Sequence, residues 1–266
     1  MGSDGARRRL LVAGNWKMNG SLAHLQALAS AIMDGALVRL DSVQLVFFPP
    51  SVYLREAQRL LGGSGVAWGA QNLSEHDDGA YTGEVSARML RELGCTCTLV
   101  GHSERRTLFG ESDEVVARKF VATSRVGLTP VLCVGESLDE HRQGMTEAVV
   151  ARQPQAVLDL AGPSAFADAV VAYEPTWAIG TGKTAKPEQA QDVHAFIRRY
   201  LAKASDPGYA EGLHILYGGS MKLANARDIL SMPDIDGGLL GGASLNVDEF
   251  IAVARTAQRL ARGDSV

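Results

Sequence analysis

Several polar residues stand where short apolar runs of the sequence end, and their types could carry out chemistry. Asn15 and Lys17 follow the first run. His102 follows the fourth run, and Glu174 ends the sixth. A carboxylate can take a proton from carbon, a neutral imidazole can donate to an oxygen that becomes negative, and an ammonium group can stabilise that charge. The combination indicates proton transfer next to a carbonyl group.

Glycine-rich turns follow the last two runs. Ser220 closes "YGGS" (217–220), and Gly241 and Gly242 open "GGAS" (241–244). Backbone N–H groups in such turns, especially at the N-terminus of a helix, bind phosphate without a dedicated arginine. The expected substrate is therefore a small phosphorylated carbonyl compound.

The apolar runs themselves predict the scaffold that positions these residues. Eight of them recur at intervals of ~23 to 44 residues, which leaves room for one strand, one loop and one helix. Near-continuous apolar runs are typical of parallel strands covered on both faces. Eight such units in ~250 residues predict an α/β fold, a (β/α)₈ barrel with eight parallel strands, although an open doubly wound sheet has similar units. The runs span residues 10–14, 43–48, 66–71, 97–101, 130–135, 169–174, 213–218 and 237–242.

The segment after the first run has the pattern of a helix. In "SLAHLQALASAIM" (21–33), apolar residues recur at helical spacing, and Ser21 is the predicted N-cap. The stripe predicted to face the core consists of Leu22, Leu25, Ala29 and Ile32. No low-complexity linker interrupts the series, so we expect one catalytic barrel domain at 9–266 and a loose N-terminal extension at 1–8.

Composition limits the partners and the compartment. A net charge of −4 argues against broad binding to nucleic acid or to an anionic membrane. The apolar run that follows three arginines ends at Asn15, which is too early for a signal peptide, and no window is long enough to span a membrane. An odd number of cysteines favours a reducing compartment. We expect a cytoplasmic protein.

The possible metal ligands lack the spacing of a metal site. Cys95 and Cys97 could supply two ligands, but no third ligand lies nearby in the sequence. The histidines outside the candidate site show no paired spacing with an acidic partner. They are His24, His76, His141, His194 and His214. We expect no metal.

Seven motifs resemble those of the triosephosphate isomerase family, and they occur in the family's order between Ala13 and Leu245. They are "GNWKMN", "AQN" followed by "GAYTGE", "VGHSERR", "CVGE", "AYEPTWAIGTGKTA", "YGGS" and "GGASL". The resemblance implies a single-domain TIM barrel. It also implies an isomerase of glycolysis and gluconeogenesis that interconverts dihydroxyacetone phosphate and D-glyceraldehyde 3-phosphate through an enediolate, with no cofactor.

The resemblance also assigns roles to residues. Glu174 would be the base, His102 a neutral electrophile and Lys17 a source of positive charge, while Asn15 would orient the substrate. The segment "AIGTGKTA" (178–185) would belong to a lid, with Lys183 as a hinge residue. The phosphate would be bound by Gly180, Ser220, Gly241 and Gly242.

The environment of His102 can be predicted from its position before a helix. Ser103 is the predicted N-cap of "SERRTLF" (103–109). The positive end of the helix dipole disfavours an imidazolium ion. We therefore expect a lowered pKa for His102.

The resemblance further implies a homodimer. The loop "NLSEHDDGAYTGE" (72–84) matches the one that enters the neighbouring subunit in the family. Thr82 would reach toward the partner subunit's Asn15 and the partner subunit's Lys17. Alternatively, this polar loop is simply solvated.

Two residues depart from the family pattern. Thr176 stands where valine is common, which could alter the hinge of the lid. Cys97 stands in the fourth apolar run where an aromatic residue is frequent, which concerns packing. Neither departure involves an expected catalytic group.

Other functions fit the motifs less well. "GTGKT" resembles the end of a P-loop, but Trp177 occupies the place of its first glycine. A dinucleotide-binding turn would need those glycines directly after the strand. A serine hydrolase built on Ser103 would need glycine where Arg105 stands. A non-catalytic barrel that acts as a binding protein or adhesin would be free to lose the candidate catalytic residues, which are all present.

Overall fold

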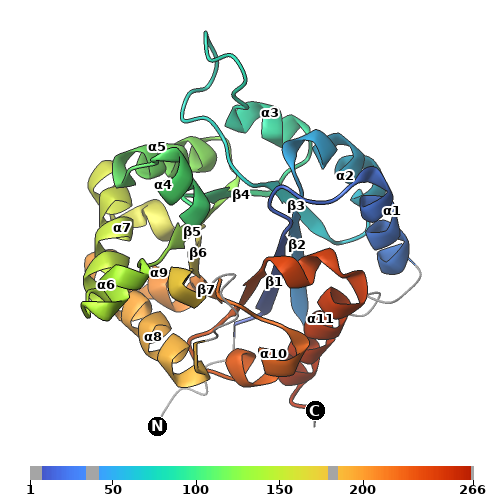
Figure 1. Cartoon of the computed structure of the whole chain (residues 1–266). Helices are drawn as coiled ribbons and strands as arrows, with labels where there is room; N and C mark the ends of the chain where they lie inside the picture. Colours follow the sequence, from blue (N-terminus) through green and yellow to red (C-terminus); the bar gives the residue numbers. More distant parts are fainter. Residues whose placement is uncertain (1–7, 34–41, 179–184, 265–266) are drawn as a thin grey trace.

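The computed structural model describes residues 8–33, 42–178 and 185–264. In these residues, eight parallel strands close into a barrel in sequence order, and β8 pairs with β1. Helices surround the strands (Figure 1). The closed barrel confirms the predicted (β/α)₈ fold and excludes an open doubly wound sheet. The strands are β1 Leu10–Asn15, β2 Val43–Phe48, β3 Ala67–Ala70, β4 Cys97–Val100, β5 Thr129–Val134, β6 Val170–Tyr173, β7 His214–Tyr217 and β8 Gly237–Leu240.

The barrel separates two apolar cores because side chains alternate along each strand. In β1, Leu11 and Ala13 belong to the cluster inside the barrel. Leu10 and Val12 belong to the larger cluster between strands and helices. The continuous apolar runs in the sequence therefore reflect burial on both faces of the sheet.

In the described residues, one or two α-helices follow each strand. Their bounds are α1 Leu22–Ala31, α2 Leu54–Leu61, α3 Ala87–Glu92, α4 Ser103–Phe109, α5 Asp113–Arg125, α6 Leu138–Arg142, α7 Thr146–Ala161, α8 Pro187–Ala204, α9 Pro207–Gly212, α10 Leu223–Leu230 and α11 Val247–Arg262. Within them, we find no helix long and apolar enough to cross a membrane.

Helix α1 matches its prediction in most respects. The Ser21 side chain accepts a hydrogen bond from the backbone N–H of His24, which confirms the predicted N-cap. Leu25, Ala29 and Ile32 are buried. Leu22 is 52% exposed, so its place in the buried stripe was wrong. As the first residue of the helix, Leu22 lies beyond the packed part of the stripe.

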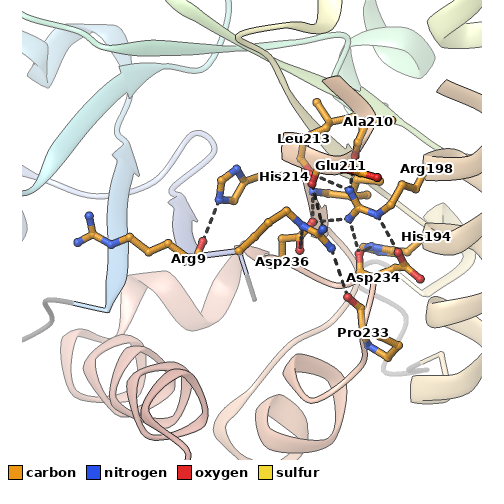
Figure 2. Close-up of polar contacts among 12 residues, drawn as sticks. Arg9, His194, Arg198, Ala210, Glu211, Leu213, His214, Pro233, Asp234 and Asp236 are labelled. Carbon is orange, nitrogen blue, oxygen red and sulfur yellow. Dashed lines mark hydrogen bonds and ion pairs between the residues drawn. The ribbon is translucent and has the colours of Figure 1, made fainter. Parts of the chain in front are cut away.

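A cluster of charged residues ties the chain together at the amino end of the barrel (Figure 2). Arg198 on α8 binds Asp234 through Nε at 2.7 Å and Asp236 through Nη2 at 2.6 Å. Arg8 binds the other oxygen of Asp236 at 2.6 Å. The sequence analysis placed Arg8 in a loose N-terminal extension. In the structure, its side chain binds Asp236, so Arg8 contacts the barrel. The boundary between the predicted N-terminal extension (1–8) and the barrel domain (9–266) stays a prediction.

Candidate active site

A pocket of about 550 Å³ opens at the carboxyl ends of the strands. It brings together most of the residues predicted from the sequence, although they come from five different strand ends. Those that line it are Asn15, Lys17, His102, Glu174, Ser220, Gly241 and Gly242. Gly180 and Lys183, which were predicted for the lid, lie outside the described residues.

Glu174 is held by two donors from the turn after β4. Its Oε1 lies 3.0 Å from Nε2 of His102, and its Oε2 accepts a hydrogen bond of 2.8 Å from the backbone N–H of Ser103. The residue is only 2% exposed. Burial acts to raise the pKa of Glu174, but the His102 ring and the Ser103 N–H outweigh it, and the pKa lies below its usual value. Glu174 is therefore a carboxylate at neutral pH.

The backbone around Glu174 is closely packed between two glycines. A Cβ on Gly218 would lie 2.8 Å from Cγ of Glu174, and a Cβ on Gly135 would overlap the carbonyl oxygen of Glu174. Both contacts are closer than side chains tolerate. The glycines that end the β5 and β7 runs thus allow the neighbouring strands to approach the candidate base.

His102 itself caps helix α4, so the prediction that Ser103 is the N-cap was wrong by one residue. Nδ1 of His102 accepts a hydrogen bond of 3.2 Å from the backbone N–H of Glu104. Because Nδ1 uses its lone pair in this bond, the ring proton lies on Nε2, which donates to Glu174. The cap fixes a neutral tautomer with Nε2–H pointing into the site.

The predicted lowering of the His102 pKa was wrong for this arrangement. Burial does lower the pKa of His102, but the Glu174 carboxylate beside the ring raises it more, and the pKa lies above its usual value. The sequence-based argument considered the helix dipole and could not include a carboxylate that is 72 positions away in the chain. Any movement of Glu174 away from the ring would remove the main cause of the increase.

Lys17 is held in an unusual backbone conformation. Among the described residues, it is the one non-glycine residue with a positive φ, at 52°. The backbone N–H of Lys17 donates to the Asn15 side chain (2.9 Å), and its carbonyl accepts from Gln71 Nε2 (2.8 Å). Its ammonium group binds Glu104 Oε1 at 2.6 Å. Strained residues of this kind often occur at functional sites, where the surrounding contacts maintain them.

Glu104 and Gln71 are functional partners that the sequence reasoning did not assign. Both belong to the quoted motifs "GHSERR" and "AQN", which was the available signal. Neither could be matched to Lys17 from sequence alone, because 87 and 54 residues separate them from it. Only the closed barrel brings these strand ends together.

Glu136 holds the backbone segment that follows Glu174 in the chain. It is fully buried, and its carbonyl accepts a hydrogen bond of 2.7 Å from the Thr176 hydroxyl. Its Oε1 accepts from Trp177 Nε1 at 2.8 Å and from the Tyr173 hydroxyl at 3.1 Å. The hydroxyl of Thr176, the family departure noted above, is therefore used to anchor the turn Thr176–Ala178.

A second pocket of about 340 Å³ lies beside the first and shares Asn15, Lys17 and His102 with it. Met18 and Phe109 line it with exposed apolar side chains. Val52 and Leu108, which are next to the lining residues Ser51 and Phe109, are exposed as well. Thr82 is exposed in the segment between β3 and α3, which projects away from the barrel (Figure 1).

The described residues contain no group of three or more His, Cys, Asp or Glu side chains that could hold a metal ion. The three cysteines are free and buried. Burial raises the pKa of the Cys97 thiol to about 12. The ionisable side chains that line the active-site pocket include the Glu174 carboxylate, the His102 imidazole and the Lys17 ammonium group.

Comparisons with known proteins agree with this geometry. A family model described as triosephosphate isomerase matches residues 10–257. A triosephosphate isomerase of Thiobacillus denitrificans is 59% identical over 252 residues, which cover 95% of this chain and 100% of the relative. One of Dechloromonas aromatica is 57% identical over 250 residues, covering 94% and 99%. One of Nitrosomonas europaea is 56% identical over 247 residues, covering 93% and 97%.

Proposed function

Since the chain belongs to the triosephosphate isomerase family, we propose that it interconverts dihydroxyacetone phosphate and D-glyceraldehyde 3-phosphate. The observation that carries this proposal is the buried pair of Glu174 and His102, 3.0 Å apart in a pocket that also holds Lys17. The conversion places the enzyme in glycolysis and gluconeogenesis.

Glu174 is the proposed base. As a carboxylate, it accepts the proton from carbon 1 of dihydroxyacetone phosphate and returns it to carbon 2. The oxygen on carbon 2 gains a proton and the hydroxyl group on carbon 1 gives one up, which leaves a hydroxyl group at carbon 2 and the aldehyde at carbon 1. The electron pair of the broken C–H bond forms the enediolate, so the carbonyl oxygen gains negative charge. The reverse reaction uses the same groups in the opposite order.

His102 is the proposed donor to that oxygen. Its Nε2–H now donates to Glu174, so substrate binding requires the two side chains to separate. Separation frees the carboxylate for the carbon and the N–H for the oxygen. It also removes the neighbour that raises the pKa of His102, while burial, which lowers that pKa, remains. A neutral imidazole is thereby favoured during the reaction.

Lys17 and Asn15 are proposed to stabilise and orient the charged substrate. The ammonium group of Lys17 supplies positive charge for an anionic ligand. Its ion pair with Glu104 holds the ammonium group in position. Asn15 is 4% exposed and holds the backbone of Lys17 through its Oδ1. Because Asn15 also lines the pocket, its amide nitrogen is the proposed donor to the ligand.

The phosphate is proposed to bind to the turns after β7 and β8. Ser220, Gly241 and Gly242 line the same pocket as Glu174. A Cβ on Gly242 would meet no atom within 4 Å, so this turn faces open space that an anion can fill. Backbone N–H groups at such a turn bind phosphate oxygens directly. We propose the same role for Gly180 of the lid.

We also propose that the protein is a cytoplasmic homodimer. Met18 and Phe109 line the second pocket beside Lys17 with exposed apolar side chains, and exposed apolar surface of this kind can mark a protein–protein interface. The loop 72–84 of one subunit would fill this pocket in the other, with Thr82 near the partner's Lys17. Three free, buried cysteines suit a reducing compartment.

A coupled assay that follows conversion of glyceraldehyde 3-phosphate to dihydroxyacetone phosphate tests the function. The wild-type protein is expected to turn over this substrate without added metal or cofactor. Purified, folded protein without activity in either direction would contradict the proposal. Sedimentation analysis tests the assembly separately, since a fully active monomer would contradict the proposed homodimer.

A further inference from the structure

His141 on α6 stacks on the indole ring of Trp177, which follows the candidate base Glu174 by three positions in the chain. The ring centroids lie 4.4 Å apart, and the ring planes form an angle of 23°. Aromatic rings at this separation attract each other beyond the effect of the apolar area that they bury. The stack therefore joins helix α6 to the turn Thr176–Ala178.

The same imidazole lies beside the carboxyl group that binds the indole N–H. Nδ1 of His141 is 3.3 Å from Oε1 of Glu136. This oxygen accepts hydrogen bonds from Nε1 of Trp177 at 2.8 Å and from the Tyr173 hydroxyl at 3.1 Å. Glu136 is fully buried, whereas the side chain of His141 is 38% exposed. Glu136 thus holds the indole at its edge, and His141 covers one of its faces.

The position of His141 is fixed by the local structure of α6. Ser137 and Glu140 form a capping box at the start of this helix. The backbone N–H of His141 donates to the Ser137 carbonyl at 2.9 Å. At the other end of the helix, Nδ1 of His141 lies 3.4 Å from the Thr146 hydroxyl at the start of α7. Contacts on both sides along the chain thus hold the imidazole against the indole.

The turn that carries Trp177 is directly connected to Glu174. The backbone N–H of Glu174 donates to the Val134 carbonyl at 2.7 Å, and that of Thr176 donates to the Glu136 carbonyl at 3.3 Å. A tilt of the indole would shift this turn and, through it, the Glu174 carboxylate. A displacement of about 1 Å at a reacting group can reduce the rate by ~10²-fold. The support of the indole therefore bears on the reaction.

We propose that His141 is a positioning residue for the isomerase reaction. By stacking on Trp177, it fixes the turn that follows Glu174 and so the place from which the carboxylate reaches the substrate. The inference rests on the proposed function. His141 is not among the residues that line the active-site pocket, so it acts through Trp177 and not on the substrate itself.

Three variants in the coupled assay test this role. His141→Ala removes the stack, so kcat should fall about tenfold while KM stays within about threefold, because the groups that bind the phosphate are unchanged. His141→Phe keeps a stacked ring and should restore kcat to within about threefold of wild type. Arg142→Ala is the matched control on the same helix, since Arg142 is exposed and pairs with the exposed Asp139. Its kcat should equal that of wild type.

The indole N–H resonance of Trp177 reports the stack in the absence of substrate. Its disappearance from the ¹H–¹⁵N NMR spectrum of Trp177→Phe identifies it. His141→Ala should shift this resonance, because the ring current of the stacked imidazole is lost, and should leave those of Trp16 and Trp68 in place. Arg142→Ala should shift none of the three.

The outcomes separate this inference from the proposed function. Inactive wild-type protein would contradict the function itself. Active wild type together with an unchanged kcat in His141→Ala would overturn the positioning role alone, even if the Trp177 resonance shifts. Equal losses of kcat in His141→Ala and His141→Phe would also overturn it, because the stacked ring would then make no difference. Should His141→Ala not fold, His141→Gln removes the ring with the same expected results.

Discussion

At the amino end of the barrel, Asp236 is bound from three sides, whereas at the carboxyl end Glu174 shares its partners with the proposed reaction. Asp236 accepts from Arg8, from Arg198 and from the backbone N–H of Ile215. These bonds connect the chain before β1, helix α8 and strand β7, and no substrate has to replace them. Glu174 instead binds the imidazole that should donate to substrate.

The difference indicates how one barrel can combine stability with chemistry. Charged groups with permanent protein partners hold the strand starts in register. Charged groups whose partners can be exchanged for a ligand occupy the strand ends. Changes at the carboxyl end should therefore affect turnover, and changes at the amino end should affect the free energy of unfolding.

The largest expected effect is on turnover. Glu174→Gln keeps the size of the side chain but removes the base, so kcat should fall ~10² to 10⁴-fold. The coupled assay measures this loss, and Glu147→Gln on the exposed start of α7 is the control. A Glu174→Gln variant with undiminished kcat would exclude Glu174 as the base.

The corresponding change at the amino end should act on stability. Asp236→Asn leaves two arginines without their carboxylate, and breaking a buried ion pair typically costs about 3 to 5 kcal/mol of unfolding free energy. Urea unfolding measures the loss, with the exposed Asp228→Asn as the control. The kcat of folded Asp236→Asn should stay near wild type; a selective loss of kcat would remove the distinction between the two ends.

Much of this fold could be predicted from the sequence, because burial on both faces leaves continuous apolar runs. The chemistry-bearing residues could be selected by their positions after those runs and by family motifs. Their contacts could not be predicted, since the Glu174–Ser103 and Lys17–Glu104 bonds join residues that meet only when the barrel closes. The wrong direction for the His102 pKa has the same origin.

A smaller effect on turnover is expected from the packing around the base. In Gly218→Ala the new methyl group would lie 2.8 Å from Cγ of Glu174, so the carboxylate has to move. A misplacement of about 1 Å can reduce the rate by up to ~10²-fold. Gly212→Ala is the matched control, because a Cβ there meets no atom within 4 Å. Equal activity of the two variants would show that the position of Glu174 tolerates this shift.

The smallest expected effect is a pH dependence of stability near the amino end. Burial lowers the pKa of His194 to about 4, so the folded protein keeps this ring neutral while the unfolded chain protonates it below ~6.5. His194 therefore leaves the free energy of unfolding unchanged above pH ~6.5 and lowers it as the pH falls from ~6.5 to about 4. Below pH ~4 this contribution is constant. At pH 5 the loss from this group is about 2 kcal/mol.

Urea unfolding of wild type and His194→Gln at pH 7 and pH 5 measures this contribution. The variant lacks the titrating ring, so its stability should fall less between the two pH values than that of wild type. Identical losses in both proteins would show that His194 does not drive the acid sensitivity.

A crystal structure with 2-phosphoglycolate, a small phosphorylated carboxylate that resembles the enediolate, tests the central claim most directly. We predict the phosphate on the turns of Ser220 and Gly241–Gly242, the carboxylate of the ligand beside Nε2 of His102 and Nζ of Lys17, and Glu174 released from Ser103. A ligand bound elsewhere, with Glu174 still hydrogen-bonded to Ser103 and His102, would contradict the account.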